Sequence, residues 1–274
     1  MIKLQISNNM RLAIDFAGNS SDQAVIFFHG GGQTRHAWGE ALEVLAAKGY
    51  FAATVDMRGH GHSDWAKDGN YHLADFADDI INLCAMFDHK PILVGASLGG
   101  LSSLLAIGSR DTDIARALVL VDIVPKMNIA GTHHIKAFMS AHPNGFASLD
   151  DAADAIAAYT PQRKRRKDLS GLSKNLRLRE DGRYYWHWDP QFLVSTKQLN
   201  LENHLEIATD NIRIPVLLVR GEKSNVVDDD GVSDFLQRVP HAEYVQVDGA
   251  AHMIAGDSNQ QFNQVVLEFL SKYK

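Results

Sequence analysis

Short, nearly continuous apolar runs recur along the chain, separated by stretches with helical periodicity. The apolar runs that predict buried strands are 24–28, 51–55, 92–94, 117–121, 216–219 and 244–247. The stretches that predict helices are 38–48, 73–87, 98–107, 231–238 and 260–272. Buried strands that alternate with helices are typical of a mostly parallel sheet covered on both faces. The pattern therefore predicts an α/β fold, preceded by a hairpin that turns at Asn8-Asn9.

One long segment interrupts this alternation. Between Pro125 and about Ile212 no buried strand is expected, and the helical stretches there are 133–141, 149–159 and 201–208. Residues 176–188 alternate in polarity around the turn signal Asp181-Gly182. We expect residues 126–211 to form an inserted, mainly helical cap, or lid, over one end of the sheet. Residues 1–125 and 212–274 would then form the core.

Composition and charge narrow the class of protein. A chain of 274 residues, 45% of them hydrophobic, suits one large α/β domain with an insertion. The formal net charge of −6 argues against a nucleic-acid partner. No stretch is apolar enough to predict a membrane span or a signal peptide, and the single cysteine, Cys84, fits a reducing, cytoplasmic setting. No metal-ligand set or nucleotide loop is evident, so no cofactor and no metal is expected; oligomeric state has no sequence signal.

The strongest chemical signal is Gly95-Ala96-Ser97-Leu98-Gly99, which fits the pattern G-x-S-x-G. A predicted strand precedes it and a predicted helix follows it. A sharp strand-to-helix turn exposes the central serine, and small neighbours relieve the crowding. The start of the helix also favours negative charge beside the serine oxygen. Ser97 is therefore the candidate nucleophile.

A nucleophilic serine needs a base and hydrogen-bond donors for the oxyanion. His252 follows the last predicted strand on a loop of small residues, and it is the candidate base. One donor would be the backbone N–H of Leu98. The other would come from the glycines after the first buried strand, where Gly31 is preferred to Gly30 and Gly32. His133, His134 and His187 lack companions at metal spacing and are expected to be ordinary cap residues.

Taken in order along the chain, these features resemble the α/β-hydrolase superfamily, specifically its lid-bearing, esterase-like members. The matching motifs are His29-Gly30 with Trp38, the stretch 56–63, the turn at Ser97 and Gly249–His252. The resemblance covers nearly the whole chain and implies the α/β-hydrolase fold with a serine, histidine and acid triad. It also implies a structural role for 56–63, with Arg58 bonded to backbone or to Asp56.

The acid is where the chain departs from the resemblance. It usually follows the strand written here as 216–219, yet Asn225 stands where an aspartate is expected. An asparagine can orient an imidazole, but it does not stabilise an imidazolium by charge. Asp122 ends the preceding core strand, where active-site groups gather in α/β sheets, or it caps backbone N–H groups there. We rank Asp122 first and Asn225 second, with Asp228 better explained as a helix N-cap.

The serine and the cap together indicate a reaction class. Serine chemistry points to acyl transfer, and the resemblance implies hydrolysis of small carboxylic esters through an acyl-enzyme. Trp186 and Trp188 either pack the core of the cap or form an apolar wall for the acyl group. The alternatives are a cofactor-free perhydrolase (haloperoxidase-like), a carbon–carbon bond hydrolase with the same triad, and a non-catalytic ligand-binding protein.

Overall fold

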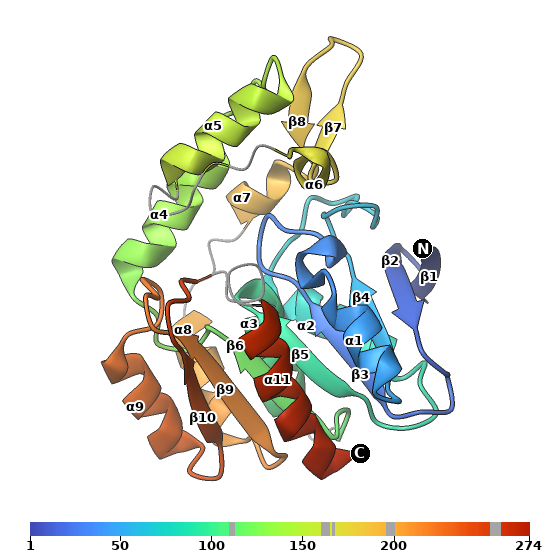
Figure 1. Cartoon of the computed structure of the whole chain (residues 1–274), viewed down its shortest axis with the longest axis vertical. Coiled ribbons are helices and arrows are strands. Elements are labelled where there is room, and N and C mark those ends of the chain that lie inside the picture. The colour runs from blue at the N-terminus through green and yellow to red at the C-terminus, as the bar shows by residue number, and fades with distance from the viewer. Residues whose placement is uncertain (110–112, 160–164, 166–167, 196–200, 253–258) are drawn as a thin grey trace.

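The computed structural model describes residues 1–109, 113–159, 165, 168–195, 201–252 and 259–274, and its centre is an eight-stranded sheet (Figure 1). The strands are β1 Ile2–Ser7, β2 Met10–Ala17, β3 Ala24–Phe28, β4 Phe51–Val55, β5 Ile92–Ala96, β6 Ala117–Val121, β9 Val216–Gly221 and β10 Glu243–Val247. They are ordered β1-β2-β4-β3-β5-β6-β9-β10. β1 and β2 form an antiparallel hairpin and β2 joins β4 antiparallel, whereas all later pairings are parallel.

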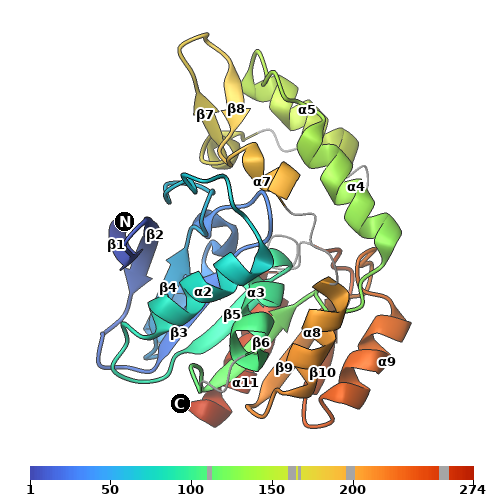
Figure 2. The ribbon, with the colours of Figure 1, turned by 180° about the vertical axis from the view of Figure 1, so that it is seen from behind.

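Helices cover both faces of this sheet, which explains why its central strands are apolar without alternation. On one face lie α1 Ala41–Ala47 and α11 Asn259–Leu270. On the other lie α2 Leu73–Cys84, α3 Leu98–Gly108, α8 Leu201–Asp210 and α9 Asp229–Arg238, seen from behind in Figure 2. All five residues of β3 and all five of β6 are buried. The predicted α/β fold with a mostly parallel sheet is confirmed.

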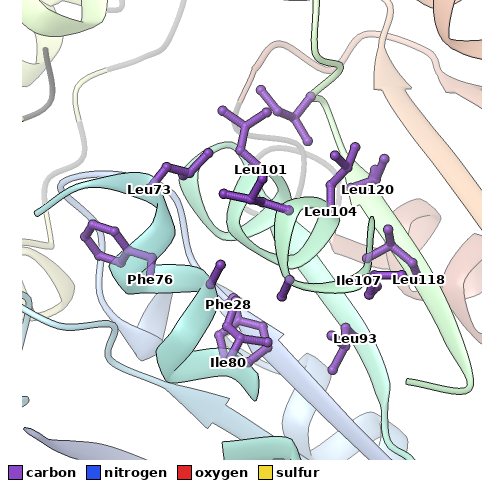
Figure 3. Close-up of a cluster of buried hydrophobic side chains, with 14 of the residues drawn as sticks. Phe28, Leu73, Phe76, Ile80, Leu93, Leu101, Leu104, Ile107, Leu118 and Leu120 are labelled. Atoms are coloured by element: carbon purple, nitrogen blue, oxygen red, sulfur yellow. The ribbon is translucent and has the colours of Figure 1, made fainter. Parts of the chain in front are cut away.

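Helix α3 is held in the middle of the larger core. Its apolar side chains Leu101 and Leu104 lie against α2 and against the strands beneath it (Figure 3). Ten of its eleven residues are buried, so the helix is fixed on nearly every side. Cys84, at the end of α2, is buried in the same cluster, and this burial raises the pKa of its thiol to about 12. The fixed position of α3 matters because Ser97 immediately precedes it.

Most of the segment between β6 and β9, from α4 to α7, forms a separate layer at the end of the sheet where β5 leads into α3 (Figure 1). Its elements are α4 Ile129–Ser140, α5 Leu149–Tyr159, α6 Ser170–Ser173, the hairpin β7 Leu176–Leu178 and β8 Tyr184–Trp186, and α7 Gln191–Ser195. We call these elements and their connections the cap layer. Helix α8 instead packs on α3, where a side chain at Gly108 would meet the Ala208 carbonyl oxygen. The predicted cap boundaries, 126 and 211, stay a prediction.

The structure departs from the expected elements in a few places. The predicted helix 38–48 is divided into a 3-10 turn, Arg35–Trp38, and α1, because Gly39 between them has φ +45°. The short helices α6 and α7 were not expected, since four or five residues carry too little periodicity to predict a helix. Across the described part of the chain, no helix combines the length and the apolar character needed to cross a membrane.

Candidate active site

Ser97 occupies a strained turn between β5 and α3. Its backbone has φ +46° and ψ −113°, a conformation rare for a residue with a side chain. The flanking glycines make this turn possible. A Cβ atom at Gly99 would lie 2.3 Å from the carbonyl oxygen of Phe28, and one at Gly95 would lie 2.6 Å from Gly100 Cα. The G-x-S-x-G pattern is therefore required by packing, and it sets Ser97 at the N-terminus of a helix.

Asp122 and His252 are brought together from distant parts of the chain. The Nδ1 atom of His252 lies 2.7 Å from Oδ2 of Asp122. A carboxylate only accepts hydrogen bonds, so Nδ1 is the donor of this bond and Nε2 is the nitrogen that could act as a base. Asp122 is completely buried with φ +50°, whereas the His252 side chain is 18% exposed. This is the contact that an orienting role for Asp122 requires; the role itself stays a prediction.

The carboxylate of Asp122 is held by two further donors. The backbone N–H of Gly221 donates to Oδ1 at 2.9 Å, and the hydroxyl of Ser224 donates to Oδ2 at 2.5 Å. The Ser224 oxygen in turn accepts from the N–H groups of Val226 and Val227. Sequence reasoning missed Ser224. The signal for it was its place in the loop after β9, beside the position where an acid was expected.

Asn225 makes no hydrogen bond to the imidazole of His252 in the described structure. Its side chain is exposed and makes no hydrogen bond to the residues that the structure describes. Its backbone oxygen instead packs against Gly131 of α4. Asp228 is the N-cap of α9, accepting from the N–H of Gly231 at 2.9 Å, as predicted. The structure thus sets Asp122, of the three candidates, beside His252.

The loop that carries His252 is tied to the loop after β9. The N–H of Lys223 donates to the carbonyl oxygen of Ala250 at 2.8 Å. The N–H of Gly249 donates to a carboxylate oxygen of Glu222 at 2.7 Å. Both bonds link the two loops that supply the partners of Asp122. The imidazole is therefore positioned by the backbone as well as by the carboxylate.

The glycine loop, residues 29–33, follows β3 and lies beside Ser97. A Cβ atom at Gly30 would lie 3.3 Å from Ser97 Cβ. The N–H of Gly30 donates to Oε1 of Gln33, and the N–H of Gly32 donates to Nε2 of His60. Within the described ranges the N–H groups of Gly31 and Leu98 have no such partner. These two groups, which were predicted as oxyanion donors, are the ones left available at this turn.

Three buried imidazoles surround the glycine loop. His29 contacts Gly30 O through Nδ1 at 2.8 Å and accepts the N–H of Met57 at Nε2. The His60 ring lies 5.1 Å from the His29 ring and 5.8 Å from the His187 ring, measured between centroids. Burial lowers the pKa of His60 to about 3, and it lowers the pKa values of His29 and His187 as well. All three rings are therefore neutral near neutral pH.

These lowered pKa values predict an acid-sensitive fold. Below the unfolded-state pKa of about 6.5, the unfolded chain binds protons that the three folded-state rings exclude. Each such histidine lowers the free energy of unfolding by roughly 1.4 kcal/mol per pH unit as pH falls towards the folded-state pKa. Urea titrations between about pH 7.5 and about pH 5 should show this loss. His60→Gln removes one such group, so the plot of unfolding free energy against pH should become shallower by about one proton. Equal slopes in wild type and His60→Gln would contradict the prediction.

One structural expectation for the stretch 56–63 was wrong. Arg58 does not bond Asp56; its guanidinium pairs with Asp79 of α2 at 2.6 and 2.7 Å. Asp56 is paired with Arg35, which approaches it at 2.6 Å. The two arginine side chains extend in different directions. Arg58 extends towards α2, whereas the 3-10 turn brings Arg35 to Asp56 at the end of β4. Sequence spacing does not report which of two arginines reaches a buried carboxylate.

Apolar side chains of the cap layer lie over the glycine loop. A Cβ atom at Gly32 would lie 2.9 Å from Met139 Cε and 3.2 Å from Trp188 Cζ3, and one at Gly31 would lie 3.4 Å from Phe192 Cζ. Phe192 was not predicted, because it belongs to the short helix α7. Of the two tryptophans predicted to bind substrate, Trp188 thus borders the glycine loop.

Trp186 is held among other aromatic rings of the cap layer. It stacks on Trp188 at 4.9 Å and contacts Phe138 and Phe146. Its substrate-binding role stays a prediction. Among the described residues, no group of three or more His, Cys, Asp or Glu side chains is arranged to hold a metal ion.

Comparison with known proteins gives relatives along the whole chain. The chain is 29% identical over 254 residues to an esterase of Mycobacterium tuberculosis, covering 88% of this chain and 80% of that protein. It is 28% identical to a non-heme chloroperoxidase of Kitasatospora aureofaciens, covering 90% and 92%. A solved structure of the M. tuberculosis esterase superposes with a TM-score of 0.79 at 27% identity, covering 98% of this chain and 91% of that one.

A further solved structure agrees on the fold. The crystal structure of E-2-(acetamidomethylene)succinate hydrolase superposes with a TM-score of 0.85 at 24% identity and covers 98% of both chains. The family model described as alpha/beta hydrolase fold matches residues 23–258, which include Ser97, Asp122 and His252. With the sheet, the turn at Ser97 and this match in agreement, the chain belongs to the α/β-hydrolase fold family.

Proposed function

We propose that this protein is a serine hydrolase that cleaves small carboxylic esters through an acyl-enzyme intermediate. The observation that carries the proposal is the 2.7 Å hydrogen bond between Asp122 and His252. Asp122 follows β6 and Ser97 follows the neighbouring parallel strand β5, so both residues lie at the carboxyl-terminal edge of the sheet. The available N–H groups of Gly31 and Leu98 supply the remaining requirement, a site for an oxyanion. Hydrolase relatives, including an esterase, support the same class of reaction.

Each residue has a definite task in this mechanism. Ser97 Oγ attacks the ester carbonyl while Nε2 of His252 takes its proton. The Leu98 and Gly31 N–H groups stabilise the oxyanion, and Asp122 stabilises the imidazolium that forms. The protonated His252 gives its proton to the leaving alkoxide as the ester C–O bond breaks. A water molecule, deprotonated by the same imidazole, then cleaves the acyl-enzyme and restores Ser97.

The surroundings of the glycine loop favour an uncharged acyl group. Besides the neutral imidazoles of His60 and His187, the nearest side chains at Gly31 and Gly32 are those of Met139, Trp188 and Phe192. These thioether and aromatic groups pack favourably against alkyl or aryl carbons and offer no ion pair to a carboxylate substrate. We therefore infer that the preferred acyl group is apolar.

Perhydrolysis is a second candidate because the chloroperoxidase relative is about as similar as the esterase. In that reaction hydrogen peroxide replaces water as the nucleophile that cleaves the acyl-enzyme, and a peracid leaves. The same Ser97, His252 and oxyanion donors would serve both reactions. A carbon–carbon bond hydrolase would also use this triad, but its substrate is a ketone rather than an ester.

A panel of p-nitrophenyl esters with graded acyl length tests the proposal. We expect turnover of the acetate and butyrate esters and rapid labelling of the protein by a fluorophosphonate probe. Peroxide-dependent halogenation of an indicator dye, measured in parallel, would identify the perhydrolase. If the protein is neither labelled nor active on any ester, the proposal is wrong and a non-catalytic binding function replaces it.

The cap layer should set the preference for acyl length. Phe192→Ala and Trp188→Ala enlarge the space over the glycine loop, so kcat/KM for octanoate relative to acetate should rise by about tenfold or more. Trp186→Ala, measured on the same two esters, tests the predicted substrate-binding role of Trp186, which stacks on Trp188. Equal losses on both esters with a lowered Tm would show instead that Phe192 and Trp188 only pack the cap layer.

A further inference from the structure

His187 connects the cap layer to two loops of the core. It follows β8, and its residue is only 1% exposed. The N–H of Gly61 donates to its Nδ1 atom at 2.7 Å, and its Nε2 atom lies 3.3 Å from the carbonyl oxygen of Gly32. The ring also meets Trp188 edge-on, with centroids 5.4 Å apart. A cap residue thus touches the glycine loop through a polar bond as well as through packing.

The direction of these bonds fixes the proton on each ring. Since a backbone N–H donates to Nδ1 of His187, the ring proton is on Nε2 and is donated to Gly32 O. His60 has the opposite arrangement: its Nε2 accepts the N–H of Gly32, and its Nδ1 donates to Arg58 O at 2.9 Å. The two polar groups of Gly32 are therefore held by two different imidazoles, one from the core and one from the cap layer.

Three consecutive peptide groups of the glycine loop are each bonded to one histidine. Gly30 O accepts from His29, Gly32 N–H donates to His60, and Gly32 O accepts from His187. The N–H that shares a peptide plane with Gly32 O belongs to Gln33, and it donates back to Gly30 O at 3.1 Å. His187 thus steadies the plane that closes the turn from Gly30 to Gln33.

This turn determines where the N–H of Gly31 points. In a trans peptide the N–H is directed opposite to the carbonyl of the same plane. Gly30 O is held on one side by His29 and by the N–H of Gln33, so the N–H of Gly31 is directed to the other side. If the plane of Gly32 and Gln33 rotated, Gly30 O would lose one of its two donors. The orientation of the Gly31 N–H therefore depends on the bond from His187.

We propose that His187 is a positioning residue for the oxyanion site: by holding Gly32 O, it keeps the N–H of Gly31 aligned for the transition state. The inference rests on the proposed esterase function and deepens it. On this proposal, transition-state stabilisation requires the cap layer to be packed against the glycine loop, in addition to any role of the cap layer in substrate selection. His187 itself touches neither substrate nor Ser97 in this mechanism.

Two substitutions separate the donor to Gly32 O from the rest of the side chain. His187→Asn keeps an acceptor for the Gly61 N–H but is too short to reach Gly32 O. His187→Gln places an amide N–H near the position of Nε2 and should restore that bond. Loss of a complete oxyanion donor costs about 10²–10³ in kcat, so misalignment by His187→Asn should cost about 10- to 100-fold. His187→Gln should recover most of this loss.

The readouts distinguish positioning from general damage to the cap layer. With p-nitrophenyl acetate, His187→Asn should lower kcat with little change in KM. The Ki of phenylboronic acid, which forms a tetrahedral adduct with the serine, should rise by a similar factor. Tyr71→Phe is the matched control. It removes the Tyr71 hydroxyl, which donates to Asp189 Oδ2 of the cap layer at 2.6 Å and accepts the N–H of Ala66 at 2.9 Å. Neither bond involves the glycine loop. Tyr71→Phe should leave kcat and the Ki within about threefold of wild type.

Each outcome has a definite meaning. An unchanged kcat in folded His187→Asn, or equal losses in His187→Asn and Tyr71→Phe, would overturn the inference while leaving the esterase proposal intact. A wild-type protein that neither turns over esters nor binds phenylboronic acid would overturn the esterase proposal, and the inference with it. If His187→Asn does not fold, His187→Leu, which fills the space and removes both bonds, takes its place with the same expected result.

Discussion

Ser97→Ala should abolish nearly all ester hydrolysis, with kcat lowered by roughly 10³–10⁶-fold. The change removes the oxygen atom that attacks the ester carbonyl and carries the acyl group in the proposed mechanism. The residual rate enhancement comes from the oxyanion donors and from substrate binding, which still act in serine hydrolases that lack their nucleophile. The fold should survive, because the strained backbone at φ +46° is held by the packing of Gly95 and Gly99. Initial rates on p-nitrophenyl acetate and a thermal melt measure both effects.

A second serine on the same helix provides the control. Ser103 is fully buried on α3, and its hydroxyl donates to the Gly99 carbonyl four residues earlier. Ser103→Ala removes a buried hydroxyl close to the turn without removing the nucleophile, so kcat should change by no more than a few-fold. Retention of wild-type turnover by Ser97→Ala, after purification from a host lacking esterase background, would rule out Ser97 as the nucleophile.

The fold was largely predictable because its signals are local. Runs such as 24–28 and 117–121 are apolar in every position, and a sheet covered on both faces is the arrangement that buries such runs. Gly95 and Gly99 predicted a sharp turn because a side chain at either position would collide with backbone. The carboxyl ends of parallel strands lie at one edge, which is why Asp122 was the first choice for the acid.

Long-range partnerships were less predictable, and they make up the rest of the site. Ser224 contacts Asp122 across 102 residues, and His187 contacts Gly32 across 155 residues. Ser224 belongs to no periodic pattern, and the alternating stretch 176–188 that contains His187 does not indicate which distant loop the imidazole reaches. The choice between Asp122 and Asn225 likewise depended on the path of the loop after β9. That path turns the Asn225 side chain towards solvent and the Ser224 hydroxyl towards the carboxylate.

Asp122→Asn should be nearly as damaging as the loss of the nucleophile, with kcat lowered by roughly 10⁴-fold, the loss seen when the aspartate of a serine-protease triad becomes asparagine. The amide would retain the size of the side chain but would not stabilise the imidazolium of His252. Its N–H₂ group would also face donors, since Gly221 N–H and Ser224 Oγ–H both point at this carboxylate. The ring of His252 would then be held in the wrong tautomer. The expected result is a large fall in kcat with a smaller change in KM.

Two neighbouring substitutions make this a test of the acid rather than of the loop. Asn225→Ala removes an exposed side chain and should change kcat by no more than a few-fold, whereas Ser224→Ala removes one donor to Asp122 and should have an intermediate effect. If Asn225 were the orienting residue, the ranking would reverse and Asn225→Asp would raise kcat. Measured on one ester, the loss of kcat should therefore be largest in Asp122→Asn, smaller in Ser224→Ala and smallest in Asn225→Ala. This order follows from the hydrogen bonds of the Asp122 carboxylate alone. Changes of no more than a few-fold in all three variants would mean that Ser97 and His252 act as a dyad, or that another carboxylate serves, with Asp228→Asn the next variant to measure.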